Sequence, residues 1–372
     1  MSFLTVNAGS SSLKLALCDA GGRVETRGAV TEIGGGAARL ETAGGAEPVA
    51  APDHRAAFAA LLPALDLPTG LTAAVHRVVH GGQALTRPVP VTAAVRDGIA
   101  ACIPLAPLHN PAALSAIDAL TPLRPDLTQI ACFDTAFHAT NPESAWRYAL
   151  PAGPETAGIR RYGFHGLSYA GLVAGWPDLT ATPLPGRLLA FHLGNGASVC
   201  AIRDGRSVAT SMGYSPVSGL TMGSRVGEID ANAVLDLADR LGIDGARRLL
   251  NAESGLKGLG GASDMRALRA AGQTGAVDHF CYWAARAAGS LAAAMGGCDG
   301  VVFTGGIGEN DAAARADIAA RLGHLGVALD PAANAAGGPA LAAANATAVP
   351  AWVLPAQEET QLVREARAAL SA

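Results

Sequence analysis

The sequence predicts an α/β protein made of two related domains, and three observations indicate this. Apolar runs typical of buried strands alternate along the chain with longer stretches of helical periodicity. Residues 3–19 and 188–205 share one pattern: an apolar run, a turn of small residues, a second apolar run and a closing aspartate. The length of 372 residues exceeds that of one ordinary hydrophobic core. A duplicated fold, each half opened by one of these hairpins, accounts for all three.

The first hairpin has an unusual turn between its apolar runs Phe3–Val6 and Leu13–Leu17. A tight hairpin favours Asn-Gly or similar pairs, and nothing in that chemistry requires three consecutive serines at 10–12. Small residues rich in hydroxyls and backbone N–H groups suit an anion that comes close to the backbone. The alternatives are an ordinary surface turn and, for the pairing of Gly9 with Gly194, a chance similarity between two hairpins.

The remaining elements follow from periodicity and from residues that start or end helices. We expect further strands at 72–82, 127–134 and 297–310, and helices at Pro111–Leu120, Ala231–Leu241, Val277–Met295 and Glu358–Leu370. Pro111 suits the first position of its helix. The alanine-rich stretch 330–350 has little periodicity and is expected to form a peripheral loop.

Composition excludes several classes of protein. The apolar fraction is 50 %, the charged fraction 16 % and the net charge −4, which gives no electrostatic basis for binding nucleic acid or an anionic membrane. No run has the length of a membrane-spanning helix, and no basic segment precedes an apolar one at the N-terminus. The six cysteines lack C-x-x-C spacing and are expected to be buried thiols in a reducing cytoplasm.

Polar residues follow the predicted strands at places where a structural role does not require them. Asp134 comes directly after the run Ile130–Phe133, where an open sheet presents it to a cleft. Gly305, Gly306 and Gly308 follow another strand and indicate a close backbone approach, with Glu309 and Asn310 as polar contacts or a helix cap. The alternatives are an Asx turn for Asp134 and a tight strand-to-helix turn for the glycines.

Three cationic side chains complete the pattern. His165 lies between two glycines, Arg225 lies in a glycine-rich loop, and Arg77 lies in an apolar strand, where a buried arginine needs an anionic partner. A core histidine is the alternative for His165. Arginines that neutralise phosphoryl oxygens, loops rich in N–H groups and a carboxylate are what phosphoryl transfer requires. No Walker A motif is present, so a kinase of this sequence is not of the P-loop kind.

The motifs together resemble the acetate kinase family of short-chain carboxylate kinases, in the sugar kinase/Hsp70/actin superfamily. The resemblance rests on NAGSSSLK, HRVVHGG, APLHNP, FDTAFH, YGFHG, HLGNGAS, TMGSRVGEID, FTGGIGEN and PAQEET, which occur in the family's order over nearly the whole chain. It implies a duplicated ribonuclease H-like (actin/Hsp70/sugar kinase) fold with two facing domains and a central cleft that closes on nucleotide. The implied domains are 1–147, completed by the C-terminal helix 359–372, and 148–358.

The resemblance also implies an activity and roles for individual residues. The family transfers the γ-phosphoryl group of ATP reversibly to acetate, giving acetyl phosphate and ADP, with Mg²⁺ (or Mn²⁺), and works as a cytoplasmic homodimer. By motif, Asp134, His165 and Arg225 match catalytic residues, Arg77 matches the residue that holds the substrate carboxylate, and Asn7 and Glu358 match the magnesium site. The nucleotide-contacting segments match Lys14, His192, Leu193, Gly194, Asn195, Gly196, Asp264, Met265, Arg266, Gly306, Ile307, Gly308, Glu309 and Asn310.

The sequence departs from the family pattern at two positions. Tyr169 stands where members commonly have a second histidine, and Ala231 stands where a proline usually follows Asp230. The alternatives in function are a kinase of propionate or another short-chain acid, and a nucleotide-dependent switch or regulatory module without catalysis. The presence together of Arg77, Asp134, His165 and Arg225 argues against the module, because a switch needs no carboxylate clamp. The residues leave open whether Asp134 contacts acetate or the metal shell.

Overall fold

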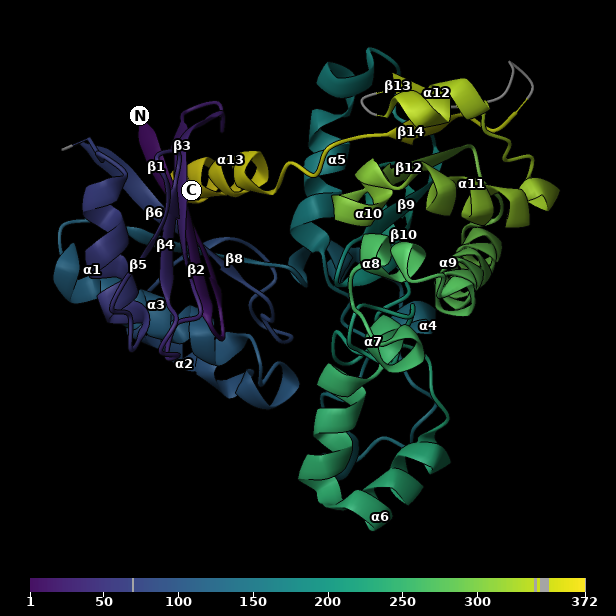
Figure 1. Cartoon of the computed structure of the whole chain (residues 1–372), viewed down its shortest axis with the longest axis horizontal. Coiled ribbons are helices and arrows are strands. Elements are labelled where there is room, and N and C mark those ends of the chain that lie inside the picture. Colours follow the sequence, from purple (N-terminus) through teal and green to yellow (C-terminus); the bar gives the residue numbers. More distant parts are fainter. Residues whose placement is uncertain (69, 338–339, 342–347, 372) are drawn as a thin grey trace. The chain divides into compact units, whose positions relative to one another are not determined.

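The computed structural model describes residues 1–68, 70–337, 340–341 and 348–371, and the chain divides into two compact units. Unit 1 comprises Met1–Phe137, Gly166–Gly171 and Gln357–Ala372, and unit 2 comprises His138–His165 and Leu172–Ala356 (Figure 1). No helix of the described residues is long and apolar enough to cross a membrane.

Unit 1 is built on an eight-stranded sheet in the order β5-β4-β3-β2-β1-β6-β8-β7. Its strands are β1 (Ser2–Gly9), β2 (Ser12–Asp19), β3 (Val24–Thr31), β4 (Arg39–Thr42), β5 (Gly45–Pro48), β6 (Leu71–Val78), β7 (Val89–Pro90) and β8 (Gln129–Phe133). Its helices are α1 (His54–Ala64), α2 (Ala93–Ala101), α3 (Asn110–Leu123) and α13 (Glu358–Leu370), with the short 3₁₀ helix η1 (Ile103–Leu105).

Alternation along the central strands divides the core of unit 1 into two layers. Leu4 and Val6 of β1 face α1 and α3, whereas Phe3 faces α13, because successive side chains of a strand point to opposite faces. On the α13 side, Leu362 and Val363 pack against the sheet. The closing helix predicted at Glu358–Leu370 is therefore confirmed, and its apolar stripe covers the face of the sheet on which Phe3 lies.

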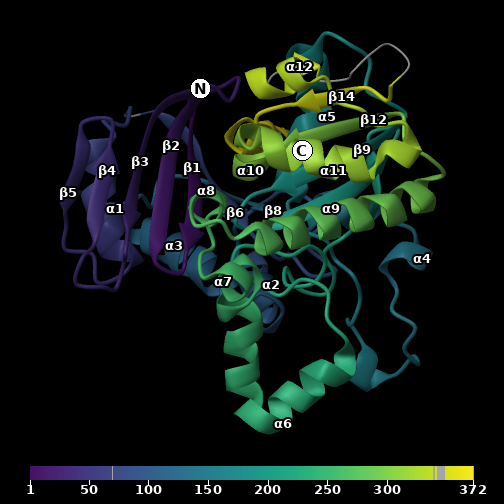
Figure 2. The same ribbon diagram turned by 45° about the vertical axis from the view of Figure 1, so that its right-hand side comes forward.

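Unit 2 is built on a six-stranded sheet in the order β11-β10-β9-β12-β14-β13. Its strands are β9 (Arg187–Leu193), β10 (Ala197–Arg203), β11 (Arg206–Thr210), β12 (Gly300–Thr304), β13 (Ala340–Leu341) and β14 (Ala351–Val353). Its helices are α4 (Glu143–Trp146), α6 (Ala231–Arg248), α7 (Gly255–Gly260), α8 (Met265–Ala270), α9 (Thr274–Met295), α10 (Gly305–Asn310), α11 (Ala312–Arg321) and α12 (Pro331–Ala336). Shorter turns are η3 (Pro154–Thr156), the π-helical η4 (Leu249–Glu253) and η5 (Gly323–Leu325). The long helix α9 lies along one face of this sheet, against β10 (Figure 2).

Two helical segments contain a boundary between the units. The 3₁₀ turn η2 (Ala136–Thr140) contains the boundary at Phe137, and α5 (Gly166–Thr180) contains the one at Gly171. Residues 138–147, predicted in the first domain, group with unit 2, where His138 Nδ1 and Ser207 Oγ are 2.8 Å apart. The predicted domain limits stay a prediction.

Five strands of each sheet share one topology. The order is β3-β2-β1-β6-β8 in unit 1 and β11-β10-β9-β12-β14 in unit 2. In each sheet the first three strands of this order are antiparallel to one another in turn. The last two strands run parallel to the third strand, which is β1 in unit 1 and β9 in unit 2. The hairpin strands end at the pairs Gly9–Ser12 and Leu193–Ala197. The prediction of a duplicated α/β fold is confirmed, whereas the facing arrangement and the cleft stay predictions.

The structure corrects some of the predicted elements. The pairing of Gly9 with Ser12 continues the strand ladder, so the expected serine loop is reduced to Ser10 and Ser11. The predicted peripheral loop begins with helix α12, because the Asp330 carboxylate caps it by accepting from Ala333 N at 2.7 Å. Residues 338–339 and 342–347 of that stretch lie outside the described residues.

One predicted helix is longer in the structure than expected, and other predicted elements are confirmed. Helix α6 continues beyond the predicted Leu241 to Arg248 with a kink at Gly242, whose φ of 71° is available to glycine. The predicted helices of α3 and α9 and the strands of β6 and β8 are confirmed with small shifts of their ends. The strand predicted at 297–310 is limited to β12 (Gly300–Thr304), and residues Gly305–Asn310 form helix α10. Five cysteines are buried and Cys298 is partly buried, all as free thiols, as expected.

Candidate active site

The predicted site residues of unit 1 centre on Arg77 and Asp134. Arg77 lies near the end of β6, and Asp134 directly follows the neighbouring parallel strand β8, so both side chains emerge at the same edge of the sheet. Arg77 Nη2 donates to Asp134 Oδ2 at 2.7 Å, and Nε lies 3.1 and 3.2 Å from the two carboxylate oxygens. The predicted anionic partner of the strand arginine is thus Asp134, in a two-pronged contact that fixes the plane of the guanidinium.

A second carboxylate approaches the other edge of this guanidinium. Glu358 Oε2 lies 3.4 Å from Arg77 Nη1, and the side chain of Asp134 is only 2 % exposed, against about a fifth for the other two. Burial raises the pKa of Asp134 above its usual value, although Arg77 opposes the rise. Burial also disfavours the Arg77 cation, but Asp134 and Glu358 outweigh it and hold the pKa of Arg77 above its ordinary value. Two carboxylates around one arginine make this end of the site attractive to a cation.

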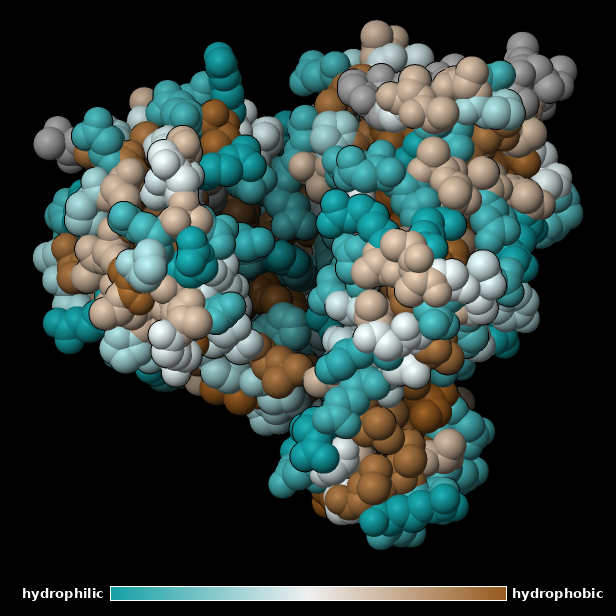
Figure 3. Space-filling view, in the orientation of Figure 1, coloured by the Kyte–Doolittle hydropathy of each residue, from teal (hydrophilic) through white to brown (hydrophobic). Residues whose placement is uncertain are grey.

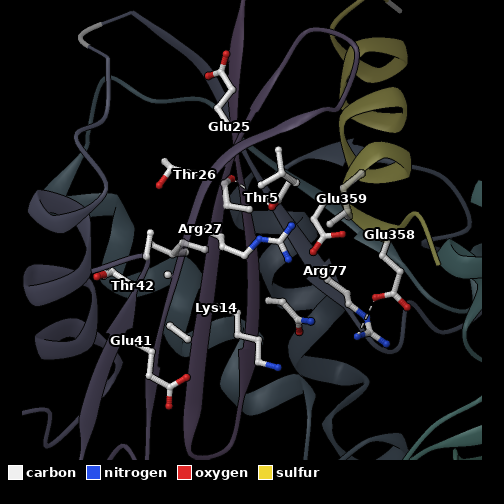
Figure 4. Close-up of a pocket in the computed structure, with 18 residues that line it drawn as sticks. Thr5, Lys14, Glu25, Thr26, Arg27, Glu41, Thr42, Arg77, Glu358 and Glu359 are labelled. Atoms are coloured by element: carbon white, nitrogen blue, oxygen red, sulfur yellow. Dashed lines mark hydrogen bonds and ion pairs between the residues drawn. The ribbon is translucent and has the colours of Figure 1, made fainter. Parts of the chain in front are cut away.

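Arg77 and Glu358 line a cavity of about 750 Å³ within unit 1 (Figure 4). Asn7 and Lys14 face each other across the β1–β2 pair and contribute to its wall, together with Arg77, Glu358 and Glu359. The Asn7 carboxamide and the Glu358 carboxylate are oxygen ligands of the kind Mg²⁺ prefers. Among the described residues no group of three or more histidine, cysteine, aspartate or glutamate side chains could hold a metal ion.

His165 is the first predicted site residue of unit 2 along the chain. It precedes α5 in the left-handed conformation, with a φ of 58°, which is uncommon for a residue other than glycine. Its Nδ1 lies 2.8 Å from Ser198 Oγ of β10, and its ring stacks on His192 with the centroids 4.2 Å apart. A Cβ placed on Gly196 would lie 3.2 Å from His165 Nε2, so this nitrogen faces the turn of the second hairpin.

Arg225 converges on the same turn. A Cβ on Gly196 would lie 3.5 Å from Arg225 Nη1, and that nitrogen donates to the carbonyl oxygen of Pro216 at 2.9 Å. The loop before Arg225 is fixed to the hairpin because Gly223 N donates to Asn195 O at 2.9 Å. A Cβ on Gly223 would lie 1.8 Å from Asn195 Oδ1, so glycine is required for this approach.

The glycine turn after β12 lies beside the second hairpin. A Cβ on Gly194 would lie 3.9 Å from Gly306 N. The Glu309 carboxylate accepts from Gly305 N and Ala356 N, each at 3.0 Å, and Asn310 Nδ2 donates to Gly306 O at 2.9 Å. These two side chains hold the turn in place, whereas Gly306 itself is exposed and presents its backbone.

The predicted Asp264–Arg266 segment forms the start of α8. Asp264 caps this helix by accepting from Ala267 N at 3.0 Å, and the side chain of Arg266 is 93 % exposed. In the part of the chain that the structure describes, α8 is tied to the segment after α10 by the ion pair of Arg269 with Asp311 at 3.1 Å. The predicted residues therefore form two groups, one around Arg77 in unit 1 and one around Gly196 in unit 2. The segment Asp264–Arg266 adjoins the second group through the Arg269–Asp311 ion pair.

Comparison with known proteins agrees with this pattern of motifs. The family model described as "Acetokinase family" matches residues 2–364. The chain belongs to that family. The acetate kinase of Deinococcus radiodurans is 44 % identical over 97 % of this chain and 96 % of its own.

Solved structures in the family resemble the whole chain. The acetate kinase of Porphyromonas gingivalis superposes with a TM-score of 0.89 at 33 % identity, covering 99 % of both chains. A propionate kinase from Francisella tularensis superposes with a TM-score of 0.92 at 33 % identity, covering 98 % of both chains. Every predicted site residue lies within the span matched by the family model.

Several residues that shape the site were not predicted from the sequence. Ser198 positions His165, the carbonyl of Pro216 receives Arg225, and Gly255 allows the Arg225 loop to close. A Cβ on Gly255 would lie 2.2 Å from Met222 O and 2.6 Å from Arg225 O, and its φ is +63°. Gly223 stands within the loop motif and was visible in the sequence. Gly255 lies thirty residues after Arg225, and only folding brings it to the loop.

Proposed function

We propose that this protein is an acetate kinase, which transfers the γ-phosphoryl group of ATP to acetate and catalyses the reverse reaction from acetyl phosphate and ADP. The observation that carries the proposal is the two-pronged Arg77–Asp134 pair at the cavity edge, in a chain of the acetokinase family. A module that only binds and releases nucleotide has no use for an arginine oriented in this way. The carboxyl group is the acceptor, so the enzyme is a phosphotransferase.

Arg77 is proposed to hold the carboxylate of acetate. Asp134 occupies the Nε–Nη2 edge of its guanidinium, so the Nη1 side remains for the substrate. Glu358 lies only loosely on that side, at 3.4 Å, and acetate can replace it. A carboxylate is already a nucleophile, so binding and orientation are the main requirements and no strong base is needed. In this proposal Asp134 positions Arg77 and does not itself touch acetate.

Asn7 and Glu358 are proposed to hold Mg²⁺, the ion that family membership implies. Their oxygen atoms line one cavity with Lys14, which fits an ion bound mainly through phosphates and water. When bound, the ion offsets the negative charge of the phosphates. A Glu358 carboxylate released from Arg77 becomes available to it, so acetate binding and metal binding favour the same rearrangement.

Arg225 and His165 are proposed to stabilise the phosphoryl group during transfer. Both face the turn at Gly196, one as a permanent cation and the other as a nitrogen held by Ser198. Donors aimed at oxygens that gain charge during transfer lower the barrier without reorganisation. The segments 192–196, 264–266 and 306–310 are proposed to bind the nucleotide. The proposal requires both groups of residues to act on one phosphoryl group.

We further propose a cytoplasmic homodimer. The buried free thiols suit a reducing compartment. Helix α6 exposes Leu235, Leu241 and Ile243, which are 63, 51 and 69 % exposed and form an apolar surface (Figure 3). Sedimentation of the wild type beside Ile243→Glu tests this: a dimer that dissociates in the variant supports the surface as the contact, and a monomeric wild type rejects the dimer.

The activity is tested with ATP, Mg²⁺ and a series of carboxylates from formate to butyrate, with acyl phosphate trapped as the hydroxamate. We expect product with acetate, less with propionate and little with butyrate, since one methylene changes binding by about 1–3 kcal/mol. The likeness to the propionate kinase makes propionate the second candidate, and a higher kcat/KM with propionate would select it. ATP hydrolysis without acyl phosphate from any carboxylate would reject both.

A further inference from the structure

His279 of α9 lies between two polar side chains, and its proton can be placed. Its Nδ1 is 2.9 Å from Thr221 Oγ1, and Trp283 Nε1 donates to its Nε2 at 3.1 Å. The indole N–H of tryptophan is only ever a donor, so Nε2 must be the acceptor. The imidazole is therefore neutral with its proton on Nδ1, and it donates to the Thr221 hydroxyl.

Thr221 connects this histidine to the Arg225 loop. It is 1 % exposed and directly precedes Met222, whose backbone N donates to Arg225 O at 3.3 Å. Leu256 N donates to Met222 O at 2.8 Å, so the loop is clamped from α7 as well. The hydrogen bond from His279 gives the loop an attachment to the long helix α9, which packs against the sheet of unit 2.

We propose that His279 is a positioning residue, which holds the Arg225 loop through Thr221 in the one imidazole form that Trp283 selects. Its effect on turnover rests on the proposed function, because it requires Arg225 to act on the transferred phosphoryl group. His279 acts on the loop through the Thr221 hydroxyl. In this proposal it governs how well the loop is placed and leaves substrate binding at Arg77 unchanged.

The contact depends on pH. Protonation of His279 would put a proton on Nε2 opposite the Trp283 N–H, so two donors would face each other. Burial lowers the pKa of His279 below its ordinary value, and Asp278 opposes this. The neutral form is present above the pKa, so the loop is held at neutral pH and loosens as the pH falls through that value.

The charged groups around His279 come from several elements. Glu228 of the Arg225 loop region and Glu253 of η4 line a cavity of about 420 Å³ with His279 and Trp283, and both carboxylates favour protonation of the imidazole. On α9, the Arg286 guanidinium lies 4.3 Å from the Trp283 ring and disfavours it. Asp278 is engaged by Arg321. Burial outweighs the acidic groups and keeps the pKa of His279 below its ordinary value, so the loss of the Trp283 contact is expected on the acid side of neutrality.

Matched variants test the proposal. Thr221→Val removes the hydroxyl, and Thr221→Ser keeps it. Trp283→Phe keeps an aromatic ring and removes the N–H. As a control, His324→Gln changes an exposed histidine of the same unit. We expect Thr221→Val to lower kcat about tenfold with the KM for acetate unchanged, because a misplaced catalytic group costs rate. Thr221→Ser and His324→Gln should retain the wild-type kcat. Trp283→Phe should move the acid limb of the kcat profile to higher pH.

A direct measurement separates the contact from the activity. Imidazole NMR on ¹⁵N-labelled protein should show His279 protonated on Nδ1 at neutral pH, with a higher pKa in Trp283→Phe. A Nε2-protonated ring, or equal kcat values for Thr221→Val and Thr221→Ser in an active folded enzyme, overturns the proposal. A wild type that forms no acyl phosphate rejects the proposed function instead, and the NMR result then still supports or overturns the contact.

Discussion

The two hairpins of the duplicated fold begin from the same framework and present opposite chemistry. In unit 1 the ends of β6 and β8 bring Arg77 and Asp134 together, and Glu358 at the start of α13 lies against the same guanidinium at the edge of a cavity lined by charged groups. In unit 2 His165, directly before α5, and Arg225, in the loop after β11, lie against the glycine turn between β9 and β10. The two sheets share a strand order, but the charged residues of unit 1 come mainly from strand ends and those of unit 2 from loops beside the second hairpin. The residue types at these places decide what each half can bind.

The largest expected effect comes from removing the cation of unit 2. Arg225→Ala should lower kcat by about 10² to 10³, the loss expected for one preorganised electrostatic donor, with a smaller change in the KM for acetate. Arg225→Lys should recover little, because a point charge cannot contact two oxygens as a planar guanidinium does. Steady-state kinetics measure both. If Arg225→Ala kept the wild-type kcat and changed only the KM for acetate, the Arg225 loop would act in substrate binding. Its role would then not differ from that of Arg77 in unit 1.

Removing the cation of unit 1 should instead act mainly on binding. Arg77→Ala should raise the KM for acetate markedly, because Arg77 holds the carboxylate before and during transfer, with some loss of kcat from misplacement. It also leaves Asp134 buried without its partner, which destabilises by about 3–5 kcal/mol. A thermal melt therefore accompanies the kinetics, and Arg77→Ala with Asp134→Asn should restore part of the stability. An unchanged KM in folded Arg77→Ala would place acetate elsewhere.

The fixed geometry of the second hairpin can be tested without touching a charge. Gly223→Ala places a methyl group against Asn195 Oδ1 and should push the Arg225 loop away, lowering kcat by about tenfold. Gly323→Ala, at an exposed position with no atom within 4 Å of the new methyl, is the matched glycine control for packing. Equal activity of Gly223→Ala and wild type contradicts the close approach.

The smallest effect concerns stability and is expected in both halves. Burial lowers the pKa of His76 in unit 1 and of His138 in unit 2 to about 4. The unfolded chain therefore binds more protons than the folded one between that pH and about 6.5, so stability falls as the pH falls through this range. Each histidine should lower the free energy of unfolding by about 1 kcal/mol as the pH falls from 7.5 to 5.5. Denaturant melts of His138→Gln and of the exposed His324→Gln measure it, and only the first should have a shallower pH dependence.

The sequence predicted the duplicated framework because that framework is encoded locally. Apolar runs in the first hairpin and its repeat specify strands, and the apolar stripe of Glu358–Leu370 specifies the closing helix. The short strands β4 and β5 were missed, since their residues have no clear alternation and their pairing depends on β3. The turn at Ser10–Ser11 was expected to be a loop, because its hydroxyls suggested a ligand and the ladder across Gly9 and Ser12 is not visible in composition.

Residue types and motif order alone determined that this is an α/β protein of the acetokinase family and which side chains are chemically suited to phosphoryl transfer. Only the tertiary structure decided their partners: Asp134 for Arg77, Ser198 for His165, and helix-cap or turn-holding roles for Asp264 and Glu309. The physical reason is that each of these contacts joins residues brought together by strand pairing or by the close approach of a glycine backbone. The sequence specifies which side chains can donate or accept hydrogen bonds, but the distances between these side chains are set only when the sheets form.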